Sequence, residues 1–227
     1  MNGAFRRLCA LLALLVLHQA RGMELPVPGG ARLRVPVASM KEMRFQTTLR
    51  QQYDFSCGSA ALATLLTHHY DYPVSEEQVF AQMFLRGDQA RIRKEGFSLL
   101  DMQRYLAARG FRADGFRLPL QKLAEARLPA IVLVADRGYH HFVVIKGVSG
   151  DRIMVGDPSA GTRMMTRAAF ESIWSGRLLF VIHHHAAPPR FNSAADWRAA
   201  PRSPLEQGID RTSLGTATIA KLGPGNF

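Results

Sequence analysis

Residues 45–182 change their hydrophobic periodicity near the middle, and this change constrains the fold more than any other feature of the chain. In the first half, apolar residues recur at the spacing of one helical face, and we expect helices over residues 57–70, 75–85, 98–109 and 120–126. The second half is typical of strands, expected over residues 130–135, 141–148, 152–156 and 178–182. Helices followed by antiparallel strands predict one α+β domain, with the helices packed on a C-terminal sheet.

The first 22 residues have the pattern of a secretory signal peptide. Arg6 and Arg7 precede an apolar stretch over residues 8–17, and Ala20 and Gly22 have the spacing of a cleavage site. The apolar stretch is too short to anchor the chain in a bilayer. We therefore expect a cleaved signal, no stable membrane span after cleavage, and a periplasmic or secreted protein of the bacterial envelope.

The two flanks of the central domain differ from it in composition. Residues 23–44 contain the prolines and glycines of an extended N-terminal segment. Residues 183–227 carry prolines and only scattered large apolar residues, which predicts an irregular C-terminal tail, draped on the domain through Phe191 and Trp197.

Composition argues against two classes of function. The formal net charge of +11 comes from scattered arginines, without the dense basic block and stacking aromatics of a nucleic-acid-binding protein. His183, His184 and His185 are consecutive, so alternate side chains on a strand would face opposite sides. His68 and His69 are adjacent on a predicted helix, which is also the wrong spacing for a shared metal. We expect no metal and no cofactor.

Cys57 would be the only cysteine of the exported chain, because Cys9 lies inside the signal. A lone thiol in an oxidising compartment is either buried and inert or retained for its reactivity. Cys57 stands at the predicted start of a helix, where Asp54 is a candidate cap. The unpaired backbone N–H groups and the helix dipole at such a position favour the thiolate.

A predicted hairpin supplies a base for this thiol. If residues 149–151 form its loop, residues pair wherever their numbers sum to 300. His141 then faces Ser159, with Asp157 as a diagonal neighbour on the same face. Asp157 would orient the imidazole, although an Asp before proline is by itself typical of a turn. His140 points the other way, so His141 is the better base.

Gln51 completes the constellation. Phe55, Tyr139 and Trp174 are candidate aromatics of a substrate cleft, although each is more typical of a core residue. Gln51 lies six residues before Cys57, so its side-chain amide can return toward the thiol. Together with the backbone N–H of Cys57 it would provide two donors for an oxyanion.

These residues resemble a known family when they are taken as a set. The family is that of the papain-like cysteine peptidases that remove double-glycine leaders from bacteriocins, the peptidase C39 family. The resemblance covers residues 45–182 and rests on four motifs in the family's order, Gln51, Cys57-Gly58, His141-Phe142 and Asp157-Pro158.

The resemblance implies a papain-like fold and a role for each motif. Cys57 is similar to the family's nucleophile, His141 to its general base, Asp157 to the residue that orients the base, and Gln51 to its oxyanion donor. It also implies a protein or peptide substrate. Exporter-fused members usually have an acidic residue in the place of Ser56 and face the cytoplasm. With its signal peptide, this chain is more similar to the stand-alone exported members, including those of functional-amyloid (Fap) secretion systems.

The expected function is therefore that of an exported cysteine endopeptidase that processes a secreted or envelope protein or peptide, with a secretion system as a candidate partner. Two alternatives stay open. A papain-like acyltransferase would form the same acyl-enzyme and pass it to another acceptor, and the acceptor depends on pocket shape. An inactive peptide-binding or secretion-assisting module would retain the fold without the chemistry.

Overall fold

The computed structural model describes residues 22–26, 32–36, 39–136 and 138–200. They fall into two units, divided between Glu42 and Met43. The first contains β1 (Gly22–Pro26) and β2 (Arg32–Pro36), which pair as an antiparallel hairpin where an extended segment was expected. Helix α2 (Met40–Arg44) crosses the division. The predicted signal lies outside the described residues except for Gly22.

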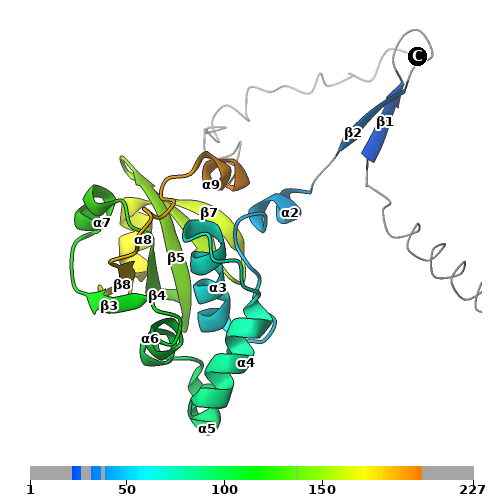
Figure 1. Ribbon diagram of the computed structural model, residues 1–227. Coiled ribbons are helices and arrows are strands. Elements are labelled where there is room, and N and C mark those ends of the chain that lie inside the picture. The colour runs from blue at the N-terminus through cyan, green and yellow to red at the C-terminus, as the bar shows by residue number, and fades with distance from the viewer. Residues whose placement is uncertain (1–21, 27–31, 37–38, 137, 201–227) are drawn as a thin grey trace, which may run out of the picture. The chain divides into compact units, whose positions relative to one another are not determined.

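The second unit is built on a six-stranded antiparallel sheet in the order β3-β8-β4-β5-β6-β7 (Figure 1). From β5 to β7, each strand lies beside the strand that precedes it in the chain. The last strand, β8, instead inserts between β3 and β4. The strands are β3 (Arg112–Phe116), β4 (Ala130–Asp136), β5 (Tyr139–Ser149), β6 (Arg152–Asp157), β7 (Gly161–Thr166) and β8 (Leu179–His183).

Helices cover both faces of this sheet, so its central strands are buried on each side. Val144 of β5 packs in one hydrophobic cluster with four of the helices, and its neighbours Val143 and Ile145 pack in a second cluster with two others. Alternation across the pleat thus accounts for the nearly continuous apolar run of β5. The first group is α3 (Cys57–His69), α4 (Glu76–Arg86), α5 (Gln89–Glu95) and α6 (Leu99–Ala107), and the second is α7 (Leu120–Ala126) and α8 (Arg167–Ile173).

The predicted α+β class and antiparallel sheet are confirmed, and the helix starts follow from capping residues. Ser75 and Ser98 each form a capping box at the starts of α4 and α6. Within residues 45–182, four elements were not predicted: α5, α8, β3 and β7. Each is only five to seven residues long, so tertiary packing rather than periodicity selects it. None of the described helices has the length and hydrophobicity needed to cross a bilayer.

The hairpin of β5 and β6 differs from the predicted register near its turn. Its loop is residues 150–151 rather than three residues, and Ser149 pairs with Arg152, so that paired numbers there sum to 301. A β-bulge at Lys146 then shifts the pairing by one residue. From residue 145 toward the start of β5, paired numbers sum to 300. The predicted loop is wrong, and the predicted register beyond the bulge is right.

The described part of the C-terminal tail is more regular than expected. Residues 194–199 form α9 (Ala194–Ala199), whose first turn is capped by the Ser193 hydroxyl. Phe191 is buried in the second hydrophobic cluster, as its predicted contact requires. Asn192 donates its backbone N–H to the Lys146 carbonyl at 3.0 Å. Residues 191–192 therefore pack beside β5 at the level of the bulge.

His69 closes α3 as a buried neutral histidine. Its Nδ1–H donates to the Arg190 carbonyl at 2.5 Å, and the Arg190 backbone N–H donates to the His69 carbonyl at 2.9 Å. Burial lowers the pKa of His69 to about 4, and the positive charge of Lys146 adds to the effect. The interior therefore holds His69 uncharged at neutral pH.

This burial predicts an acid-sensitive fold. Because the pKa of His69 lies lower in the folded protein than in the unfolded chain, only the unfolded chain takes up this proton between about pH 6.5 and 4. The free energy of unfolding should be unaffected by His69 above that window and fall by about 3 kcal/mol across it. Urea unfolding of the wild type and His69→Gln at several pH values measures the difference. Equal pH slopes for the two proteins would contradict the assignment.

Candidate active site

Cys57 is the first residue of α3, as predicted. The N-cap residue is Ser56, and no side chain caps the helix. The Ser56 hydroxyl instead donates to the Tyr53 carbonyl at 3.0 Å. The expected cap, Asp54, is wrong, because the N-cap position belongs to Ser56 and the Asp54 side chain bonds to no N–H of the first turn. The positive end of the helix is thus left for charge that develops at the sulfur or beside it.

The thiol of Cys57 is buried, with the residue only 7 % exposed. Burial raises the pKa of the Cys57 thiol, and the backbone N–H groups of Phe142 and Gly58 beside the sulfur counteract this only in part. The helix start does not outweigh burial, so the expected preference for thiolate is wrong for the unliganded protein. A base is needed to ionise this sulfur.

His141 is placed to be that base. It is 5 % exposed at the start of β5, one residue before Phe142, whose backbone lies against the Cys57 sulfur. Its Nε2 lies 3.2 Å from Asp157 Oδ2. A carboxylate only accepts hydrogen bonds, so the proton of this contact is on Nε2. Nδ1 is buried, and no described residue bonds to it. This nitrogen therefore keeps a lone pair for a proton.

Asp157 is both a turn residue and the partner of His141. Its Oδ1 accepts from the backbone N–H and hydroxyl of Ser159 at 2.9 and 2.7 Å. Its Oδ2 contacts His141 and also Arg163, whose Nη2 lies at 3.1 Å. Burial alone would raise the pKa of Asp157, but the hydrogen bonds from His141 and Ser159 hold it well below the usual range. The carboxylate therefore stays ionised beside the imidazole. His140, by contrast, is exposed.

Gln51 lies beside this pair through its backbone. Its N–H donates to the Pro158 carbonyl at 3.1 Å, directly after Asp157. Its side-chain Nε2 donates to the Tyr53 carbonyl at 3.2 Å, and its buried Oε1 has no partner among the described residues. The side chain reaches the Tyr139 hydroxyl as well. Gln51 is therefore next to the other predicted site residues, with its side-chain amide bonded to the Tyr53 carbonyl.

Two residues extend the site beyond the four predicted ones. Tyr139, expected only as a candidate cleft aromatic, stacks on the His141 ring with centroids 5.4 Å apart, and its hydroxyl donates to the Asp54 carbonyl at 3.0 Å. Tyr139 stands two residues before His141, so both side chains lie on one face of the strand. This spacing in the sequence could have predicted that Tyr139 lies beside the base. Arg163 was missed, because nothing in the sequence pairs β7 with Asp157.

No metal centre accompanies this arrangement in the part of the chain that the structure describes. There, no group of three or more His, Cys, Asp and Glu side chains could hold a metal ion. A buried thiol, an imidazole with a free nitrogen and an ionised carboxylate are the components of nucleophilic acyl transfer.

The model of a protein family described as the Peptidase C39 family matches residues 46–186. The chain is 40 % identical over 177 residues to a protein of Pseudomonas aeruginosa named "Probable functional amyloid protease FapD", which covers 76 % of this chain and 78 % of the relative. A protein of the same name from Pseudomonas fluorescens is 41 % identical over 176 residues, with 77 % and 78 % covered.

A solved structure shows the same fold. It is the peptidase domain of Streptococcus ComA, described as a bi-functional ABC transporter involved in a quorum-sensing pathway, with a TM-score of 0.50 and 22 % identity. The match covers 60 % of this chain and 96 % of that domain. The expected papain-like peptidase fold is confirmed by this likeness.

The stacked ring of Tyr139 predicts a covered site. Tyr139→Ala should increase the labelling rate of Cys57 by N-phenylmaleimide several-fold, because the bulky reagent gains access to the thiol. Tyr139→Phe serves as the control, since it keeps the ring and loses only the contacts of the hydroxyl with Asp54 and Gln51. Labelling rates measured by mass spectrometry test this, and a Tyr139→Ala rate equal to that of the wild type would show that the ring covers nothing.

Proposed function

Because the chain belongs to the peptidase C39 family and is a cysteine peptidase, we propose that Cys57 is its nucleophile, His141 its general base, Asp157 the residue that orients this base, and Gln51 an oxyanion donor. The observation that carries the proposal is the state of the His141 ring. One nitrogen is engaged by Asp157 and the other is buried and unpartnered, beside the segment that contacts the Cys57 sulfur.

The reaction begins with proton transfer from the Cys57 thiol to Nδ1 of His141. The sulfur attacks the carbonyl carbon of the scissile peptide, and the negative charge moves to the carbonyl oxygen. Asp157 stabilises the imidazolium that forms, as a carboxylate does when it holds one imidazole tautomer. Its low pKa suits this role, because a neutral carboxyl group would not offset the new positive charge.

The tetrahedral intermediate then collapses. The Cys57 backbone N–H and the Gln51 amide stabilise its oxyanion, after the amide leaves the Tyr53 carbonyl. His141 gives its proton to the departing amine, and a thioester remains on Cys57. Water activated by His141 hydrolyses this thioester and regenerates the thiol.

The substrate and the compartment are part of the same proposal. The pattern of residues 1–22 supports export to the periplasm, where the chain would process a secreted or envelope protein or peptide. The relatives named as probable functional amyloid proteases support a substrate among the proteins of a functional-amyloid secretion system.

Peptide cleavage is the direct test of this function. The purified protein should cleave members of a mixed peptide library, with product masses that show addition of water, and Cys57→Ala should reduce cleavage to background. His141→Ala and Asp157→Asn should each lower kcat/KM by roughly 10²- to 10⁴-fold, because proton transfer is lost or misdirected. His140→Ala is the matched control and should retain full activity. Cleavage that survives Cys57→Ala would exclude the proposed nucleophile.

Alkylation tests the thiol–imidazole pair without a substrate. Iodoacetamide should label wild-type Cys57 faster than His141→Ala at pH 7, because the variant has no acceptor for the proton. In that variant the pH at half-maximal rate should lie above about 8.5, the ordinary thiol value, since burial raises the pKa of Cys57. Identical pH profiles for the two proteins would mean that His141 is not the base.

Export has its own measurement. Expression in a Gram-negative host followed by cell fractionation should place the protein in the periplasm, and sequencing of its amino terminus should start at Met23. A cytoplasmic protein that retains residues 1–22 would contradict the proposed location.

A further inference from the structure

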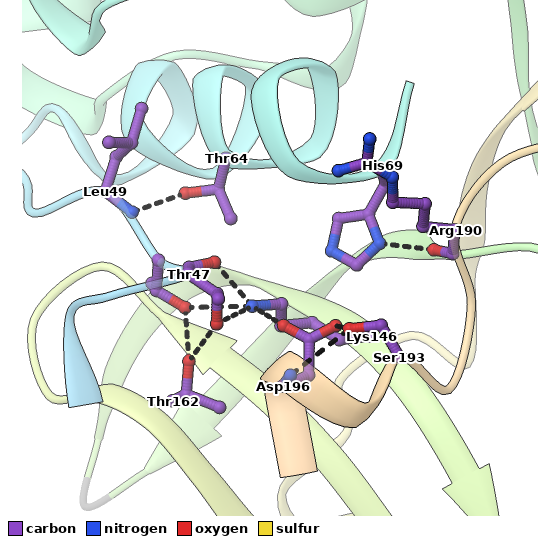
Figure 2. Close-up of polar contacts among 10 residues, drawn as sticks. Thr47, Leu49, Thr64, His69, Lys146, Thr162, Arg190, Ser193 and Asp196 are labelled. Atoms are coloured by element: carbon purple, nitrogen blue, oxygen red, sulfur yellow. Dashed lines mark hydrogen bonds and ion pairs between the residues drawn. The ribbon is translucent and has the colours of Figure 1, made fainter. Parts of the chain in front are cut away.

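Lys146 is a buried cation that the proposed mechanism does not use. It is the bulged residue of β5 and is fully buried, at 0 % exposure. Its Nζ donates to the Thr47 carbonyl at 2.5 Å and the Thr47 hydroxyl at 2.7 Å, and it forms an ion pair with Asp196 of α9 (Figure 2). Three segments distant in the sequence thus meet at one ammonium group.

The surrounding strands leave room for this side chain. A Cβ on Gly156 would lie 2.9 Å from Lys146 Cδ and 2.9 Å from Thr48 Oγ1, closer than real Cβ contacts allow. Gly156 of β6 is thus the residue over which Lys146 passes to reach Thr47. The bulge contributes as well, because it releases Lys146 from the regular pairing with β6.

On one side of the ammonium group, residues 190–196 connect two catalytic elements. Arg190 exchanges two hydrogen bonds with His69, at the end of the helix that Cys57 begins. Asn192 bonds to the Lys146 and Val148 carbonyls of β5, the strand that carries His141. Asp196 is 2 % exposed and anchors Lys146. These contacts lie beyond residue 186, where the family match ends.

On the other side, Lys146 holds the start of the segment that carries Gln51. The Thr48 hydroxyl lies 2.7 Å from that of Thr162, and the Leu49 N–H donates to the Thr64 hydroxyl of α3 at 2.9 Å (Figure 2). Gln51 itself is held at Pro158. Residues 47–51 are thus held at Thr47, at Leu49 and at Gln51. Lys146 provides the contact at Thr47, the end that lies farther from the proposed catalytic residues.

A buried ion pair contributes little net free energy to the stability of a fold. Desolvation of both charges offsets their attraction, and apolar residues of similar volume often stabilise a core equally well. Burial lowers the pKa of Lys146, and the Asp196 carboxylate counteracts this, so the pair maintains its charge at a cost. A role in placing the groups around the ammonium explains the residues better than a role in stability.

We propose that Lys146, anchored by Asp196, is a positioning residue that sets the place of Gln51 through the Thr47 segment. The inference rests on the proposed function of Gln51 as an oxyanion donor. It makes the C-terminal residues 190–196 part of the catalytic unit, since Asp196 supplies the counter-charge of Lys146.

A double-mutant cycle on the full chain tests this inference. The probe is the p-nitrophenyl ester of N-acetylglycine, whose carbonyl is attacked by Cys57 with release of nitrophenolate. Gln51→Ala should slow acylation by roughly 10²-fold, the loss typical of one oxyanion donor. Lys146→Met should slow it by roughly 10- to 100-fold through misplacement of Gln51. The double variant should be no slower than Gln51→Ala, because Lys146 acts through Gln51.

Two further measurements separate positioning from loss of structure. Alkylation by iodoacetamide needs no oxyanion donor, so its rate should stay near the wild-type value in Lys146→Met. Lys146→Met/Asp196→Leu should recover the unfolding temperature of the wild type and remain slow in acylation. Asp71→Ala is the matched control, because it removes the exposed carboxylate that pairs with Arg190 of the same segment, and its acylation should be unchanged.

The outcomes distinguish the two proposals. Full additivity in the cycle, or wild-type acylation in Lys146→Met/Asp196→Leu, would overturn the positioning role and leave the proposed peptidase mechanism intact. A wild-type protein whose Cys57 is alkylated by iodoacetamide and never acylated by the ester would overturn the proposed function, and this inference with it.

Discussion

The contact between His141 and Asp157 depends on the β-bulge at Lys146. Near the turn, residues of β5 and β6 pair where their numbers sum to 301, and beyond the bulge where they sum to 300. If the first register continued, Asp157 would share a face with the even-numbered residues of β5, opposite to His141, because a shift by one residue reverses every side chain. The bulge restores the face on which the 3.2 Å contact forms.

Burial gives the site its second constraint. The same packing that holds His141 against Asp157 raises the pKa of the Cys57 thiol and leaves the sulfur protonated until a base takes the proton. Thiolate is the form of cysteine that oxidants attack. In the oxidising compartment proposed for this chain, a lone thiol that is buried in its neutral form is protected from such oxidation. In the proposed mechanism its activation requires His141 at each cycle, which makes reactivity depend on the position of the imidazole ring.

The parts that sequence predicts are those governed by local rules. The apolar spacing of α3, the capping serines of α4 and α6 and the strands around the core follow from periodicity and cap chemistry. The predicted register was right because two local errors cancelled: the loop is one residue shorter than expected, and Lys146 bulges. A bulge on a buried lysine has no local signature, since its cause lies in Thr47 and Asp196, far away in the chain. The same holds for Arg163 and for α9.

The β-bulge at Lys146 and the ion pair between Lys146 and Asp196 depend on each other. A bulged residue in a sheet covered on both faces must place its side chain in the interior, and a lysine there requires acceptors. The Thr47 carbonyl and the Asp196 carboxylate are such acceptors. Once they are arranged around an ammonium group, an apolar side chain would deprive the carbonyl of this donor and the carboxylate of its counter-charge. The register that aligns His141 with Asp157, the segment that carries Gln51 and the C-terminal segment that supplies Asp196 are therefore coupled through one residue. A change at any of them alters the geometry available to the others.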